Sequence, residues 1–105
     1  MSVERMQAYA AAGASGAFVP CVTQPAQMRS IAEVVPLPLN VMWLPGLVGH
    51  ADLVAAGVRR VSAGPALYVH AWAALATATE AMLGGALAWP EGAPGYGELN
   101  RLFDA

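Results

Sequence analysis

The stretch AFVPCVTQPAQMRSIAEVVPLPLNVMWL, residues 17–44, decides the fold. Two short apolar runs, 17–22 and 39–44, flank a segment whose apolar residues recur at helical spacing. Because neither run alternates between polar and apolar residues, both are predicted to be strands buried on both faces. A helix between two such strands implies parallel pairing through a right-handed crossover.

The helix between the two strands has recognisable ends. Thr23 is predicted to cap its start, with Pro25 in the first turn. Pro36 ends the helix, because the residue before a proline avoids helical backbone angles. A stripe at three- and four-residue intervals forms the expected core face: Met28, Ile31, Ala32 and Val35.

The same alternation continues outward in both directions. A helix is expected over residues 2–13, capped by Ser2 and closed by Gly13. A third strand is expected at 58–62, where Arg59 and Arg60 should point to opposite faces. The remaining segments are a short helix at 50–56, a long one at 65–83 that is apolar nearly all round, and a tail at 86–105 with an amphipathic end at 98–103.

Alternating helices and strands predict an α/β fold with about three parallel strands and four helices. Three parallel strands are too few for a stable open sheet with both edges bare. The composition agrees, since 57% of the 105 residues are apolar and only 11% are charged. The chain is therefore expected to be part of a larger sheet or barrel.

Charge and composition exclude several function classes. Disorder is excluded by the high apolar content, and nucleic-acid binding by five arginines, no lysine and a net charge of -2. Three charge-free stretches, 6–28, 34–51 and 61–79, favour buried elements over membrane spans, because prolines, glycines or polar residues interrupt them. Cys21 is the one cysteine, which fits a reducing, cytoplasmic location.

Four segments in register resemble the isocitrate lyase / phosphoenolpyruvate mutase superfamily: ERMQAYAAAGA (4–14) followed by FVP (18–20), PLNV (38–41), GVRRVS (57–62) with GPAL (64–67), and YGELNRLF (96–103). The resemblance implies the C-terminal portion of a (β/α)8 barrel, with strands six to eight in this chain. It also implies an enzyme that makes or breaks C–C or P–C bonds in small 2-oxo or hydroxy carboxylates with Mg²⁺. The final helix, 65–83, would pack on a neighbouring subunit of a homo-oligomer.

The resemblance also implies that the family's metal-binding acids, its loop cysteine and its strand-five arginine lie upstream of the matched region. Cys21 is not that loop cysteine. The chain alone is thus expected to be inactive, with no catalytic residue and no bound metal. Met1 falls within a family helix, as if an upstream portion were lost or the start codon were misassigned. Whether the chain is an enzyme stays open. The alternative is a non-catalytic remnant that serves as an oligomerisation or binding module.

The resemblance implies that two residues, Asn40 and Pro20, occupy substrate-binding positions of the family. Asn40, expected at the end of strand seven, matches a substrate-contacting residue, although it could instead satisfy backbone groups. Pro20 stands where lyase members carry a glutamate, which argues against an isocitrate or methylisocitrate lyase. Val69 replaces a common arginine, and Ser15 replaces a common aspartate.

The remaining candidates favour structural roles. His70 is expected to pack on a helix rather than to catalyse, and His50 to lie in a loop or cap. A buried Cys21 would behave as a small apolar residue. Gly64–Pro65 favours a tight turn over an anion site, and Trp43 and Trp72 favour core positions over ligand platforms.

Overall fold

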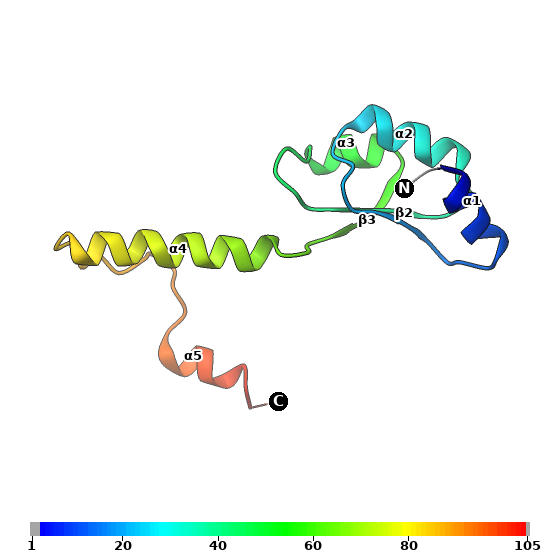
Figure 1. Cartoon of the computed structure of the whole chain (residues 1–105). Coiled ribbons are helices and arrows are strands. Elements are labelled where there is room, and N and C mark those ends of the chain that lie inside the picture. Colours follow the sequence, from blue (N-terminus) through cyan, green and yellow to red (C-terminus); the bar gives the residue numbers. More distant parts are fainter. Residues whose placement is uncertain (1–2, 105) are drawn as a thin grey trace. The chain divides into compact units, whose positions relative to one another are not determined.

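The structure, a computed structural model, describes residues 3–104 and confirms the predicted alternation of helices and strands (Figure 1). The predicted cap at Ser2 lies outside the described residues. The chain divides into two compact units, Met1–His70 and Ala71–Ala105, which are described separately. The elements are α1 (Val3–Ala11), β1 (Ala17–Val19), α2 (Pro25–Val34), β2 (Leu39–Met42), α3 (His50–Ala55), β3 (Val58–Ser62), α4 (Ala66–Leu83) and α5 (Tyr96–Arg101).

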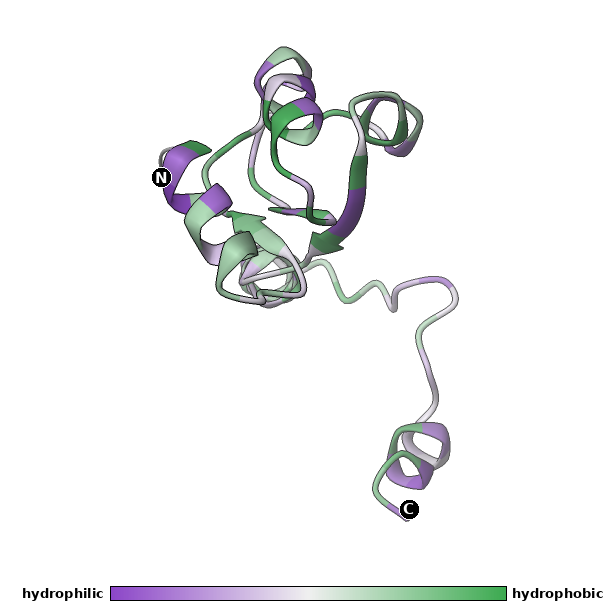
Figure 2. Ribbon diagram, turned by 90° about the vertical axis from the view of Figure 1, so that its right-hand side faces the viewer, coloured by the Kyte–Doolittle hydropathy of each residue, from purple (hydrophilic) through white to green (hydrophobic). Residues whose placement is uncertain are grey.

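The three strands form one parallel sheet in the order β1-β2-β3. The pairing between β2 and β3 shifts by one residue, because Leu39 lies opposite Val58 and Asn40 opposite Arg60. Arg59 is the extra residue of this irregularity. The alternation of side chains is therefore interrupted between Arg59 and Arg60. The prediction that these two side chains point to opposite faces assumed a regular strand. Figure 2 shows the hydrophilic section of β3 between its apolar ends.

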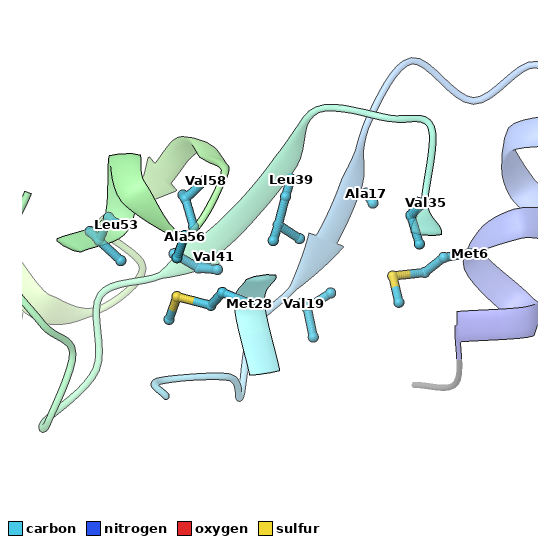
Figure 3. Close-up of a cluster of buried hydrophobic side chains, with 10 residues drawn as sticks. All are labelled: Met6, Ala17, Val19, Met28, Val35, Leu39, Val41, Leu53, Ala56 and Val58. Carbon is cyan, nitrogen blue, oxygen red and sulfur yellow. The ribbon is translucent and has the colours of Figure 1, made fainter. Parts of the chain in front are cut away.

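The hydrophobic core lies between one face of the sheet and the helices α2 and α3, which contact β2 and β3 (Figure 1). Figure 3 shows its ten buried side chains: Met6, Ala17, Val19, Met28, Val35, Leu39, Val41, Leu53, Ala56 and Val58. In β1 and β2, alternate residues supply this core, as strand geometry requires. The predicted stripe of α2 is confirmed, since Met28 and Val35 are buried and Ile31 and Ala32 pack against the core.

The prediction that the strands at 17–22 and 39–44 are buried on both faces is wrong for β1 within this chain. Phe18, in the middle of β1, is 42% exposed, and Arg60 in β3 is exposed. The physical reason is that α2 and α3 pack on only one face of the sheet. Side chains that point to the opposite face, which we call the open face, are not covered by these helices.

Several element ends differ from the prediction. Strand β1 ends at Val19 and β2 at Met42, because turns begin at Pro20 and soon after Met42. Pro25 opens α2 as predicted, but the residue before the helix is Gln24, whose side chain makes no capping bond. The predicted cap at Thr23 is therefore wrong by one position.

Helix α4 has no buried residue along its 18 positions. Its exposed large apolar side chains include Leu67, Val69, Leu75 and Leu83. The tail contains one further helix, α5, which overlaps the predicted amphipathic segment at 98–103. None of the helices in residues 3–104 combines the length and the apolar character that a membrane crossing needs.

Gly57 closes α3 in a position that only glycine tolerates. Its φ is +83°, and a Cβ there would lie 2.7 Å from the Cβ of Ala32.

Gly57→Ala should lower the free energy of unfolding by about 2–4 kcal/mol, from the left-handed backbone angle and the overpacking together. Gly13→Ala is the matched control, because Gly13 has φ +90° but no atom within 4 Å of the added Cβ. Urea unfolding should show the smaller loss at Gly13, and equal losses would contradict the packing explanation.

Candidate functional site

Polar side chains of β2 and β3 meet at one position of the sheet. The side-chain amide nitrogen Nδ2 of Asn40 donates a hydrogen bond to Ser62 Oγ at 2.9 Å. The same hydroxyl lies 3.3 Å from Asn40 Oδ1, to which it can donate. Ser62 is the last residue of β3, at the carboxyl end where sites of parallel α/β barrels are built.

Asn40 is the one buried polar side chain among the described residues, at 7% exposure. Such a group is costly to bury without hydrogen bonds, and Ser62 supplies them. The structure does not show the alternative that Asn40 satisfies backbone groups, because both hydrogen bonds of its side chain run to the Ser62 hydroxyl. The amide retains a second N–H that can donate to a further acceptor.

The sequence predicted Asn40 at the end of its strand, and this position is wrong. It is the second residue of β2, which continues to Met42. Its link to the carboxyl end runs through Ser62, which belongs to the GVRRVS segment (57–62) and for which the sequence predicted no role. The signal that could have found Ser62 is its place in β3, two residues beyond Arg60 and thus in the same alternation.

The turn after β3 fixes this end of the sheet. Gly64 has φ +52°, and a Cβ on it would lie 2.7 Å from the sulfur of Met42. The backbone N–H of Trp43 donates to the Ser62 carbonyl at 2.8 Å, which continues the pairing beyond β2. The tight-turn role predicted for Gly64 therefore has a packing cause: glycine lets the turn approach Met42.

His70 packs against an aromatic ring, in agreement with its predicted structural role. Its ring centroid lies 5.3 Å from that of Trp43, with the planes tilted by 38°. Both side chains are exposed, so the prediction of a core position for Trp43 is wrong. The contact joins the segment after β2 to the first turns of α4.

The other candidate positions are spread around the molecule. Pro20 directly follows β1 at the carboxyl end and is half-buried, whereas Val69 is exposed on α4. Ser15 lies at the opposite, amino end of β1. Cys21 is exposed, so the expectation of a buried thiol is wrong: the turn that ends β1 carries it out of the sheet.

A hollow of about 380 Å³ lies over the open face of the sheet, toward the amino ends of β1 and β2. Its lining combines apolar, amide and cationic side chains: Ser15, Gly16, Ala17, Phe18, Pro38, Asn40 and Arg60. A second hollow, beside α3, is lined by both Arg59 and Arg60 together with His50 and neighbouring apolar residues. Neither hollow has an acidic side chain in its lining.

The described residues do not fit a magnesium site. Within 3–104, no group of three or more histidine, cysteine or acidic side chains is placed to hold a metal ion. Mg²⁺ prefers carboxylate and other oxygen ligands, and the Asn40–Ser62 pair offers only a neutral amide and hydroxyl. What the pair can do is hold an oxygen atom of an anionic ligand through neutral hydrogen bonds.

The sequence matches known proteins over nearly its full length. The sequence profile of the family described as phosphoenolpyruvate phosphomutase matches residues 1–83. An uncharacterized protein from two strains of Mycobacterium tuberculosis, CDC 1551 / Oshkosh and H37Rv, is 38% identical over 104 residues. That match covers 98% of this chain but 39% of the relative, so the chain spans well under half of the curated relatives' length.

Two solved structures from Burkholderia cenocepacia J2315 resemble this one. A protein assigned as a lyase/mutase is 32% identical, with a TM-score of 0.84 over 98% of this chain and 38% of its own. A protein assigned as a phosphonomutase is 39% identical, with a TM-score of 0.64 over 74% of this chain and 33% of its own. These likenesses confirm the α/β class and the predicted portion of a TIM-type barrel.

Removing the Ser62 hydroxyl should leave the buried Asn40 amide without its side-chain partner. Ser62→Ala is expected to lower the free energy of unfolding by about 1–3 kcal/mol, measured by urea denaturation. Ser30→Ala is the matched control, because the Ser30 hydroxyl bonds only to the carbonyl of Ala26 on an exposed helix face. The double variant Asn40→Ala/Ser62→Ala should lose less than the sum of the single losses. Strict additivity would show that the two side chains are not coupled.

Proposed function

Because the chain belongs to the phosphoenolpyruvate phosphomutase family, we propose that it forms part of the catalytic barrel of a family enzyme. That enzyme makes or breaks C–C or P–C bonds in small 2-oxo or hydroxy carboxylates. The observation that carries this proposal is the family match across α1 to α4, residues 1–83. The names of the two Burkholderia relatives, a lyase/mutase and a phosphonomutase, support the same class of chemistry.

The proposed contribution of this chain is substrate binding. Asn40, oriented by Ser62, donates its remaining amide N–H to a carboxylate or phosphonate oxygen of the substrate. Pro20 forms part of the apolar wall at the carboxyl end of β1 and makes no charged contact. A neutral donor suits this task, because it binds an anion without creating an unpaired charge when the site is empty.

Mg²⁺ would supply Lewis-acid chemistry in the complete enzyme. The acids that hold it would come from the portion of the barrel that this chain does not contain. The proposed location is the cytoplasm, where an exposed thiol such as Cys21 stays reduced.

The chain by itself should be inactive. Purified chain incubated with Mg²⁺ and phosphonopyruvate, oxaloacetate or methylisocitrate is expected to give no product above a metal-free blank. A full-length family enzyme assayed in parallel is the positive control. Turnover by the purified chain that chelation abolishes would contradict the proposal that its catalytic groups lie elsewhere.

Helix α4 is proposed to pack on a neighbouring subunit, as the final helix does in the family. The supporting observation is that this 18-residue helix has no buried position and a single formally charged residue, Glu80. Burying these apolar side chains in an interface would stabilise it by about 25 cal/mol per Å² of apolar surface removed from water. The same observation supports the alternative function, a non-catalytic oligomerisation module.

Self-association can be tested with one substitution on α4. Leu75→Glu should shift the chain toward monomer in size-exclusion chromatography with light scattering, because a carboxylate cannot be buried unpaired. Gln27→Glu, on the exposed side of α2, adds the same charge and should leave the mass unchanged. A wild-type chain that is monomeric at all concentrations would contradict both the proposed packing and the alternative module.

A further inference from the structure

The start of α4 contacts the segment that follows β2 through two aromatic rings. The ring centroids of Trp43 and His70 lie 5.3 Å apart, with the planes tilted by 38°. The backbone of Trp43 is tied to the sheet, because its N–H donates to the Ser62 carbonyl at 2.8 Å. His70 is the fifth residue of α4 and the last residue of the first compact unit. The contact therefore joins the carboxyl end of β2 to the part of α4 that belongs to this unit.

The two segments that meet here contain no formally charged residue. Residues 34–49, which include Trp43, have no ionisable side chain, and residues 61–79 have only Tyr68 and His70. The formally charged residues lie just outside these two segments: Glu33, Asp52, Arg60 and Glu80. No ion pair of His70 occurs within residues 3–104, where its ring contact is with Trp43. A proton on His70 therefore meets an indole ring and no carboxylate.

The interaction between these rings depends on the charge of His70. Histidine is the side chain whose charge ordinarily changes between pH 5 and 8. A cation within about 6 Å of an indole centroid is attracted to the negative face of the ring, and this attraction adds to the packing of the neutral rings. Trp43 is 41% exposed, so the added attraction is that of a surface pair, about two- to fivefold in an equilibrium constant.

The dipole of α4 works against a positive charge near its amino end. This effect falls off within the first helical turn, and His70 lies beyond the first four residues of α4. The attraction to Trp43 acts at the position of His70 itself. Protonation should therefore strengthen the contact rather than weaken it.

We propose that the Trp43–His70 contact is a proton-sensitive attachment of α4, which holds the start of this helix on the end of β2 more firmly when His70 is protonated. The start of α4 is then held more tightly at about pH 5.5 than at about pH 8. This regulatory contact goes beyond the proposed function and does not rest on it, since both residues belong to the first unit of this chain.

The test is a double-mutant cycle in the complete 105-residue chain. Trp43→Leu, His70→Ala, the double variant and the wild type are unfolded in urea at about pH 5.5 and about pH 8. The coupling between the two side chains should be about two- to fivefold larger, as an equilibrium constant, at the lower pH. Other titrating groups and the helix dipole are present in all four chains, so their effects cancel in the cycle.

A second measurement follows the contact in the folded chain. The chain has three tryptophans, so the background Trp72→Phe/Trp89→Phe leaves Trp43 as the fluorescent reporter. Its emission should change between the two pH values, because a charge appears beside the indole. His70→Phe keeps a ring at this position but cannot take up a proton, so it should abolish the change. His50→Gln is the matched control, because it removes the other histidine and should leave the change intact.

The contradicting results are specific. Equal coupling at the two pH values would show that the contact does not respond to the proton. An emission change that survives in His70→Phe, or that disappears in His50→Gln, would assign the response to another group and overturn the proposal. Coupling of zero at both pH values would show that the two rings do not hold α4 at all.

Discussion

A parallel sheet exposes two faces of side chains, and in residues 3–70 helices cover only one of them. This constraint sets most other features of the first unit. The ten core residues come from the covered side of the sheet, from α1, and from α2 and α3 with the residues that directly follow them. Because strand residues alternate, each buried core position in β1 and β2 is next to a position on the other face. The size of the core therefore also sets the size of the face that remains open.

The open face is not uniformly polar, as a solvent-facing sheet would be. It holds a half-exposed phenyl ring and a buried amide that is bonded to a neighbouring side chain. The Asn40–Ser62 pair has the character of an interior network, in which each polar group is satisfied before burial is complete. Asn40 is the second residue of β2, and its hydrogen bond with Ser62 links it to the carboxyl end of β3. Arg60 is the middle residue of β3 and lies opposite Asn40 in the sheet register.

The sequence predicted the local features well because they depend on neighbours within one turn or one strand. The bounds of β3, the core stripe of α2 and the apolar character of α4 follow from spacing alone. The Asn40–Ser62 pair did not, because its partners are 22 residues apart and meet only through sheet register. The register itself contains an irregularity at Arg59 that no local pattern signals. Cys21 was predicted to be buried because its neighbours are apolar, but β1 ends at Val19 and a turn begins at Pro20, so the thiol is exposed.

Helix α4, like the open face of the sheet, exposes apolar side chains to water. It has no charged face opposite them. A surface helix normally has one apolar stripe and an opposite charged face. In α4, Glu80 is the single formally charged residue of 18, and exposed apolar residues occur from Leu67 to Leu83. Thr79 adds little polar surface, since its hydroxyl donates a hydrogen bond to the carbonyl of Leu75 within the helix. A helix of this composition gains stability from contacts on several sides. This composition is the basis of the proposal that α4 packs on a neighbouring subunit.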